Sequence, residues 1–112
     1  LHVHSLFDAE DSYGPLAAYA AVERHGDPLG RNSLVIGPWY HGQQLLGDGS
    51  KTGPFDWQQD TSDQFRREML LPFLRSILKP GAEAQRTVPV RAFETGANRW
   101  RTYSAWPPAE AT

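Results

Sequence analysis

The run SLVIG at residues 33–37 limits the possible folds of this chain more than any other segment. Its apolar side chains stand at consecutive positions. A strand with two apolar faces is typical of a parallel sheet that helices cover on both sides. The run is short and stops at Gly37-Pro38, a pair that marks a turn. It therefore predicts a buried strand in an α/β fold.

Two further segments complete a βαβ unit with this strand. Residues 1–7, LHVHSLF, alternate apolar and polar positions before they turn apolar, as a strand does. Residues 16–25, LAAYAAVERH, are rich in strong helix formers, with a suitable start at Gly14-Pro15 and a natural stop at Gly26. Strand, helix and strand in this order predict one right-handed βαβ unit.

The second half of the chain predicts a loop, a long helix and a β-hairpin. Residues 40–59 are dense in Gly, Asp and Ser, which is typical of a loop. Apolar residues then recur at helical spacing with Pro72 inside the pattern, which predicts a kinked helix. Thr61 and Gln64 have the spacing of a capping box at its start. Residues 88–106 contain two β-rich segments around Gly-Ala-Asn, as a hairpin does.

Composition excludes several classes of protein. The net charge of −2 leaves no electrostatic footprint for nucleic acid or an anionic membrane surface, so we expect neither as a partner. The chain has no cysteine, which excludes disulfides and thiolate metal sites. It begins with Leu1 rather than Met and enters strand-like sequence at once, so we expect a piece of a longer protein.

Asp8 and His41 each follow one of the two predicted strands. Because the carboxyl ends of parallel strands meet at one edge of a sheet, the two side chains should emerge close together. An aspartate can orient an imidazole and stabilise its cation while the histidine moves a proton for a nucleophile. Aspartates are also common turn residues, and histidines are common in loops. From the residues alone, a catalytic pair and a purely structural turn both stay open.

His2 and His4 alternate along the first predicted strand and so share one of its faces. Such a pair can bind a metal ion together with a third ligand, but packing beside a site is the commoner role of two strand histidines. We therefore expect no metal ion at these two histidines.

Three segments resemble one family of enzymes. They are FDAED followed by SYG at residues 7–14, LVIGPWYHG at residues 34–42, and FRREMLLPFLRSILKPG at residues 65–81. They look like the C-terminal half of the catalytic domain of the X-prolyl dipeptidyl-peptidase/cocaine-esterase (CocE/NonD) family of serine hydrolases. Within that family they are most similar to the α-amino acid ester hydrolases and the glutaryl-7-aminocephalosporanic acid acylases. The stretch at residues 94–108 resembles the opening hairpin of the family's jelly-roll domain.

The resemblance implies a division of the chain. Residues 1–82 would be the C-terminal portion of an α/β-hydrolase catalytic domain, and residues 83–112 the beginning of a β-sandwich, or jelly-roll, domain. Relatives commonly assemble as homo-oligomers and many are exported, which implies a homo-oligomeric parent protein in the periplasm or outside the cell. The resemblance implies no metal or organic cofactor.

The resemblance also implies a role for four residues. Asp8 would be the acid and His41 the base of a Ser-Asp-His triad. Glu10 and Asp11 would hold the α-ammonium group of a substrate, together with a third carboxylate from outside this chain. Acids near the start of a helix also favour its dipole, so a structural role for Glu10 and Asp11 stays open beside the binding role.

The nucleophile is the missing part of this triad. The family carries it in a Gly-x-Ser-Tyr-x-Gly elbow, and no such run occurs among these 112 residues. We therefore expect the chain alone to be inactive, and its parent to hydrolyse small acyl compounds (esters, amides or β-lactams) through a serine ester intermediate. The alternative is a non-catalytic binding or assembly module. A Gly-x-Ser-x-Gly elbow in the preceding sequence would decide between the two.

Overall fold

The computed structural model describes residues 1–79, 81 and 88–109, and within these residues one mixed sheet has the strand order β1-β2-β5-β6. Strands β1, β2 and β5 run parallel, and β6 is antiparallel to β5. The strands of this sheet are β1 His2–Ser5, β2 Leu34–Gly37, β5 Val90–Glu94 and β6 Arg99–Tyr103.

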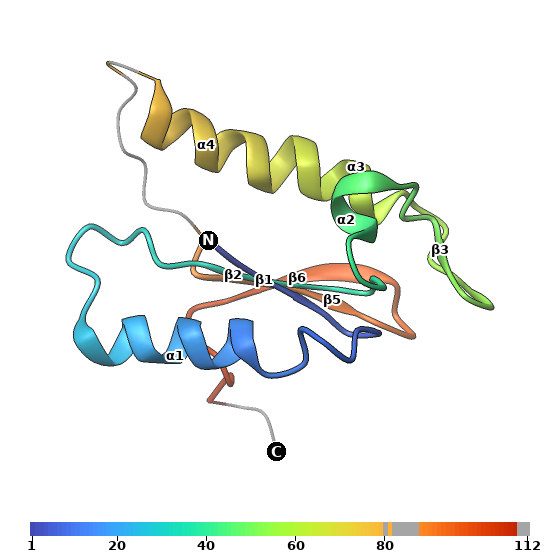
Figure 1. The fold of residues 1–112 in the computed structure, drawn as a ribbon, viewed down its shortest axis with the longest axis horizontal. Coiled ribbons are helices and arrows are strands. Elements are labelled where there is room, and N and C mark those ends of the chain that lie inside the picture. Colours follow the sequence, from blue (N-terminus) through green and yellow to red (C-terminus); the bar gives the residue numbers. More distant parts are fainter. Residues whose placement is uncertain (80, 82–87, 110–112) are drawn as a thin grey trace.

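Helices cover both faces of this sheet, as the apolar character of β2 predicts (Figure 1). One face carries α1, Gly14–His25. The other face carries three helical segments end to end, α3 Thr61–Phe65, η1 Arg66–Leu70 and α4 Leu71–Leu78. The predicted α/β fold is thus confirmed. Among the residues that the structure describes, no helix is both long and apolar enough to span a membrane.

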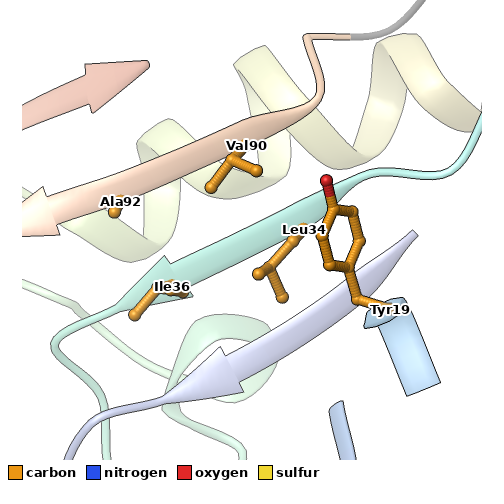
Figure 2. Close-up of a cluster of buried hydrophobic side chains, with 5 residues drawn as sticks. All are labelled: Tyr19, Leu34, Ile36, Val90 and Ala92. Atoms are coloured by element: carbon orange, nitrogen blue, oxygen red, sulfur yellow. The ribbon is translucent and has the colours of Figure 1, made fainter. Parts of the chain in front are cut away.

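The core between α1 and the sheet is built from alternate positions of two neighbouring strands. Its members are Tyr19 of α1, Leu34 and Ile36 of β2, and Val90 and Ala92 of β5 (Figure 2). Leu34 and Val90 face each other in the register of the two strands, and both are completely buried. Burial of each such side chain contributes roughly 1.5–3 kcal/mol to folding. Parallel pairing of β2 with β5 therefore aligns this core.

Trp39 is the centre of the core on the opposite face. Its side chain is completely buried, and its ring contacts that of Phe65 in α3 at a centroid distance of 5.3 Å. The indole Nε1 donates a hydrogen bond to Thr61 Oγ1 at 3.0 Å, which joins the end of β2 to the start of the long helix. Gly37 leaves room for this ring, because a Cβ at residue 37 would lie 2.2 Å from it.

The long helix begins at a cap one residue before the expected one. Asp60 is the N-cap, and its carboxylate accepts hydrogen bonds from the backbone N–H groups of Ser62 and Asp63. Thr61, expected at this position, instead uses its hydroxyl to donate to the carbonyl of Gly49 at 2.7 Å. A carboxylate is the stronger acceptor for these N–H groups and suits the positive end of the helix dipole.

The irregularity expected at Pro72 takes the form of a π-helical segment just before it. In this segment, η1, the N–H of Leu71 donates to the carbonyl of Arg66, five residues back. Pro72 has no N–H to donate, and a proline ring crowds the carbonyl four residues earlier, here that of Glu68. Because Glu68 lies within the wider π turn, the helix accommodates the proline and continues to Leu78.

The C-terminal hairpin belongs to the same sheet as the βαβ unit. Strand β5 pairs with β2 from Leu34–Val90 to Ile36–Ala92, and β6 pairs with β5. The described strands of residues 83–112 therefore extend the α/β sheet, and the interpretation of this range as the beginning of a β-sandwich stays a prediction. Strand β2 is apolar on both faces, so pairing on both of its edges removes it from water. The predicted boundary between residues 82 and 83 lies outside the described residues.

The expected loop at residues 40–59 contains short elements that its composition did not predict. They are α2 Gln43–Leu46 and a two-stranded ribbon of β3 Lys51–Thr52 and β4 Phe55–Asp56. The side chain of Gln43 holds them together: it is almost completely buried, and its Nε2 donates to the carbonyls of Asp48 and Lys51. A buried amide bonded to distant backbone groups leaves no periodic pattern in the sequence.

Candidate acid–histidine site

Asp8 and His41 are placed by main-chain bonds that continue beyond the ends of β1 and β2. The N–H of Leu6 donates to the carbonyl of Gly37 at 2.9 Å, and the N–H of Phe7 donates to that of Trp39 at 3.0 Å. These two bonds tie the segment before Asp8 to the segment before His41. The two side chains therefore emerge at the same edge of the sheet, as the sequence predicts.

The acid and the histidine form a direct hydrogen bond. His41 Nδ1 lies 2.8 Å from Asp8 Oδ2. The Asp8 side chain is only 1% exposed, whereas the His41 side chain is 62% exposed. The carboxylate accepts, so Nδ1 carries the proton and the other ring nitrogen, Nε2, is the one that can receive a further proton. Gly42, with a φ of 80°, turns the chain directly after the histidine.

The second oxygen of Asp8 holds its own loop. Asp8 Oδ1 accepts hydrogen bonds from the backbone N–H groups of Glu10 at 2.9 Å and Asp11 at 3.4 Å. Burial alone would raise the pKa of Asp8, but the bonds from Glu10, His41 and Asp11 together outweigh it and hold that pKa below its usual range. Asp8 is therefore ionised, and its charge is available to the imidazole.

Two further carboxylates surround the imidazole. Asp11 Oδ2 lies 3.5 Å from His41 Nδ1, and Glu10 Oε2 lies 3.8 Å from His41 Nε2. The hydrogen bond that His41 donates to Asp8 is the largest cause that raises the pKa of His41, followed by the charges of Asp8 and Glu10. Burial lowers this pKa, and the charge of Asp11 is the smallest of the causes that raise it. Helix α1 begins only at Gly14 and has no acid in its first turn, so the helix-dipole explanation of Glu10 and Asp11 is not favoured.

The two strand histidines have separate partners. His4 is buried, and its Nδ1 lies 2.9 Å from the backbone oxygen of Asp11. His2 Nε2 lies 2.8 Å from Asn32 Oδ1, near the other end of β1. A metal site shared by His2 and His4 is therefore not what the structure shows. No sequence pattern indicates the contact from His4 to Asp11, because it links a side chain to a backbone group in an irregular loop.

Asp8, Asp11 and His41 are the described residues that could together hold a metal ion, since one ligand atom of each lies within 4.8 Å of the others. A metal ion would need a ligand atom from both Asp8 and His41. His41 Nδ1 and Asp8 Oδ2 already bond to each other at 2.8 Å, and an ion bound through these two atoms would have to break that bond. The arrangement is thus better suited to moving protons than to binding a cation.

Aromatic rings lie beside the acid, and sequence reasoning did not group them. Phe7, next to Asp8 in the chain, stacks on Phe55 of β4 at a centroid distance of 5.7 Å, and Phe55 stacks on Trp57 at 5.8 Å. Trp57 is buried, whereas Phe7 and Phe55 are about half exposed. Both exposed rings are in irregular or very short segments, so no periodic signal indicated that they meet.

Comparisons with known proteins identify relatives of known structure. No protein-family model matches the chain, and no curated protein sequence matches it significantly. A crystal structure of an aminopeptidase from a marine sediment archaeon, Thaumarchaeota archaeon, is 41% identical with a TM-score of 0.82 over 95% of this chain. A selenomethionine-labelled α-amino acid ester hydrolase is 41% identical with a TM-score of 0.83 over 92% of it.

The extent of these matches defines what the chain is. Both enzymes are hydrolases of the CocE/NonD type. The chain spans only 17% of the length of each. Over nearly all of its own length the chain has the fold of the matching part of these enzymes, and 41% of its residues are identical to theirs. The resemblance seen in the FDAED and GPWYHG segments is thereby confirmed. Over nearly all of its length the chain is therefore similar to one part of hydrolases of the X-prolyl dipeptidyl-peptidase/cocaine-esterase (CocE/NonD) type.

Proposed function

We propose that this chain supplies the acid and the base of a Ser-Asp-His triad in a hydrolase that cleaves acyl bonds. The observation that supports this best is the hydrogen bond of 2.8 Å between the buried Asp8 carboxylate and the exposed His41 imidazole. In such a triad the acid is shielded from water and fixes the tautomer, while the histidine presents its second nitrogen to the nucleophile. The nucleophilic serine and the oxyanion-hole donors come from outside this chain.

The proposed reaction is acyl transfer to water in two steps. His41 Nε2 takes the proton of the serine hydroxyl as its oxygen attacks the substrate carbonyl, and the bond from Nδ1 to Asp8 stabilises the imidazolium that forms. The imidazolium then protonates the leaving alcohol or amine, and the acyl group stays on the serine. Water attacks this ester with His41 again as the base, which releases the acid and regenerates the serine.

The proposed substrates are α-amino acid esters and related amides or β-lactams. The side chains of Glu10 and Asp11 are 79% and 42% exposed, and each has a carboxylate oxygen within 4 Å of a His41 ring nitrogen. Exposed carboxylates at this place can hold an ammonium group next to the carbonyl under attack. The names of the two similar enzymes, an aminopeptidase and an α-amino acid ester hydrolase, both denote action on amino-acid derivatives.

The test uses the full-length protein that carries this chain. Asp8→Asn should lower kcat for ester hydrolysis by about 10⁴-fold, and His41→Gln by about 10⁴- to 10⁶-fold, as loss of a triad acid or base does. His25→Gln is the matched control, because His25 ends α1, is exposed, and lies at the far end of the helix from the site. Labelling by a fluorophosphonate should fall in the same two variants and persist in the control.

Two outcomes would contradict the proposal. Retention of kcat within a few-fold in His41→Gln would remove His41 from the chemistry. Absence of fluorophosphonate labelling and ester hydrolysis in the unmodified full-length protein would instead favour the non-catalytic binding or assembly module.

A further inference from the structure

His4 lies beneath the loop that carries the three acids, and the proposed chemistry does not use it. The residue is on β1 and is only 8% exposed. Its Nδ1 bonds at 2.9 Å to the backbone oxygen of Asp11, seven residues further along the chain. A carbonyl oxygen can only accept, so His4 Nδ1 is the protonated nitrogen and the donor.

This bond holds Asp11 more firmly than its other backbone contact does. The N–H of Asp11 reaches Asp8 Oδ1 at 3.4 Å, whereas its carbonyl accepts from His4 at 2.9 Å. The next two residues do not tie the loop to the sheet through their side chains. The hydroxyl of Ser12 donates to the carbonyl of Ala9 in the same loop, and Tyr13 is the N-cap of α1 without a side-chain hydrogen bond. His4 is therefore the side chain that ties this part of the acid loop to the sheet.

The position of Asp11 affects the site because its carboxylate faces the exposed histidine. Asp11 Oδ2 lies 3.5 Å from His41 Nδ1, whereas Glu10 Oε2 lies 3.8 Å from the other ring nitrogen, Nε2. A shift of about 1 Å in a positioning group can cost two orders of magnitude in rate. The bond from His4 to the Asp11 carbonyl thus affects where the negative charge of Asp11 lies relative to the His41 imidazole.

We propose that His4 is a positioning residue, which holds the backbone of Asp11 so that the Asp11 carboxylate faces His41 and the ammonium group of a substrate. The substrate part rests on the proposed function, whereas the geometric part, that His4 sets the distance from Asp11 to His41, does not. His4 touches neither the substrate nor His41; it acts through Asp11.

The chain offers a matched control in His2. His2 is on the same strand and the same face as His4, and it also bonds through one ring nitrogen, to Asn32 Oδ1 at 2.8 Å. That bond is at the end of β1 away from Asp8. A substitution at His2 therefore reproduces the loss of a strand histidine and of its hydrogen bond without releasing the acid loop.

Two polar substitutions at His4 separate positioning from packing. The amide nitrogen of an asparagine side chain can occupy the place of an imidazole Nδ1, whereas that of glutamine reaches the place of Nε2. His4→Asn should therefore keep the bond to Asp11, and His4→Gln should lose it. Both side chains are polar and of moderate size, and thermal unfolding of both variants measures any difference in stability that loss of the bond causes.

The first experiment measures the pKa of His41 without any substrate. In the full-length protein, deuterium exchange at the imidazole C2–H, followed by mass spectrometry across pH, reports each histidine separately. Release of Asp11 removes a negative charge beside His41, so His4→Gln should lower the pKa of His41. His4→Asn and His2→Gln should leave it at the value of the unmodified protein.

The second experiment measures KM for two esters that differ only in the amino group, phenylglycine methyl ester and phenylacetic acid methyl ester. His4→Gln should raise KM about tenfold for the amino ester and change it less than twofold for the other, which corresponds to the loss of one well-placed charged contact. His4→Asn should restore the difference.

The two experiments fail in different ways. An unchanged His41 pKa in His4→Gln, or an equal change in His2→Gln, would overturn the positioning role whatever the protein hydrolyses. A lowered His41 pKa without any discrimination between the esters would keep the positioning role and refute ammonium binding. Hydrolysis that persists in His41→Gln would refute the proposed function and would leave the positioning role of His4 intact.

Discussion

A single buried carboxylate organises the candidate site. Asp8 divides its two oxygens, one for the imidazole of His41 and one for the N–H groups of Glu10 and Asp11. The same side chain thus sets the tautomer of the histidine and the shape of the loop that carries two more acids. A change at Asp8 is therefore expected to alter charge and geometry together.

Substitution of Asp8 should change the pH at which His41 titrates. The bond and the charge of Asp8 are the main causes that raise the pKa of His41, so Asp8→Asn should lower that pKa towards or below the ordinary value of about 6.5. Because the pKa is raised in the folded state, the bond adds stability that is fully present below about 6.5 and is lost as pH rises through the raised value. Imidazole C2–H exchange measures the pKa; an unchanged value in Asp8→Asn would contradict the assignment.

The two neighbouring acids should differ in their effect on substrate binding. Asp11 is less exposed than Glu10, and a charge is screened less where it is less exposed. Glu10→Gln should raise KM for phenylglycine methyl ester by only about 2- to 5-fold, as exposed ion pairs do, and Asp11→Asn should raise it more. Steady-state kinetics on this ester and on phenylacetic acid methyl ester checks the order; equal effects on both esters would contradict it.

At this scale, strand ends were the informative part of the sequence. Asp8 and His41 could be paired because each follows a strand that periodicity identifies, and parallel strands end at one edge. His4 and Gln43 could not be assigned their roles, because each bonds to backbone groups in irregular segments. The catalytic roles of Asp8 and His41 and the binding roles of Glu10 and Asp11 stay predictions.

Among the elements, β2 carries the most constraints in the fewest residues. It is buried along its whole length, pairs on both edges, and ends at Gly37, where the ring of Trp39 folds back over the strand. Trp39 in turn contacts Phe65 and Trp100. The close approach at Gly37 therefore joins the sheet to the helix and the hairpin.

Gly37→Ala should destabilise the fold. The added Cβ would lie 2.2 Å from the ring of Trp39, which is completely buried and packs against Phe65 and Trp100. Overpacking of this kind costs about 1–3 kcal/mol and should lower the thermal midpoint. Gly14→Ala is the matched control, since a Cβ there meets nothing within 4 Å. Circular dichroism during heating measures both, and equal midpoints would contradict the packing argument.

Elements with a hydrophobic period could be predicted, and elements held by polar side chains could not. The boundaries of α1 follow from Gly14-Pro15 and Gly26, whose φ of 94° suits glycine. In contrast, α2 depends on the buried amide of Gln43. The sheet partner of β5 also could not be foreseen, because composition identifies a β-rich segment but does not say which strand it joins.

As a whole molecule, the described chain leaves apolar surface uncovered. Strand β1 is an edge of the sheet. The outer face of α4 exposes large apolar side chains, namely Leu71, Leu74, Ile77 and Leu78. An unpaired strand edge and a row of exposed leucines both favour association.

The 112-residue chain produced by itself should therefore self-associate. Analytical ultracentrifugation should show dimers or larger species, and the double substitution Leu74→Glu with Leu78→Glu should reduce their fraction. Leu29→Glu is the control, because Leu29 is 62% exposed but lies in the turn after α1, away from that face. A stable monomer at micromolar concentration would contradict this expectation.

The two main-chain bonds beyond the ends of β1 and β2 have a consequence for how such a site can be inherited and altered. They join the segments before Asp8 and His41 directly, so both residues move as one body if the unit shifts against its surroundings. A shift of this unit would then change the distance between His41 Nε2 and the nucleophile, but not the distance between His41 and Asp8. Mutations elsewhere can reshape the substrate pocket while the acid and the base keep their mutual distance, which leaves substrate preference free to diverge.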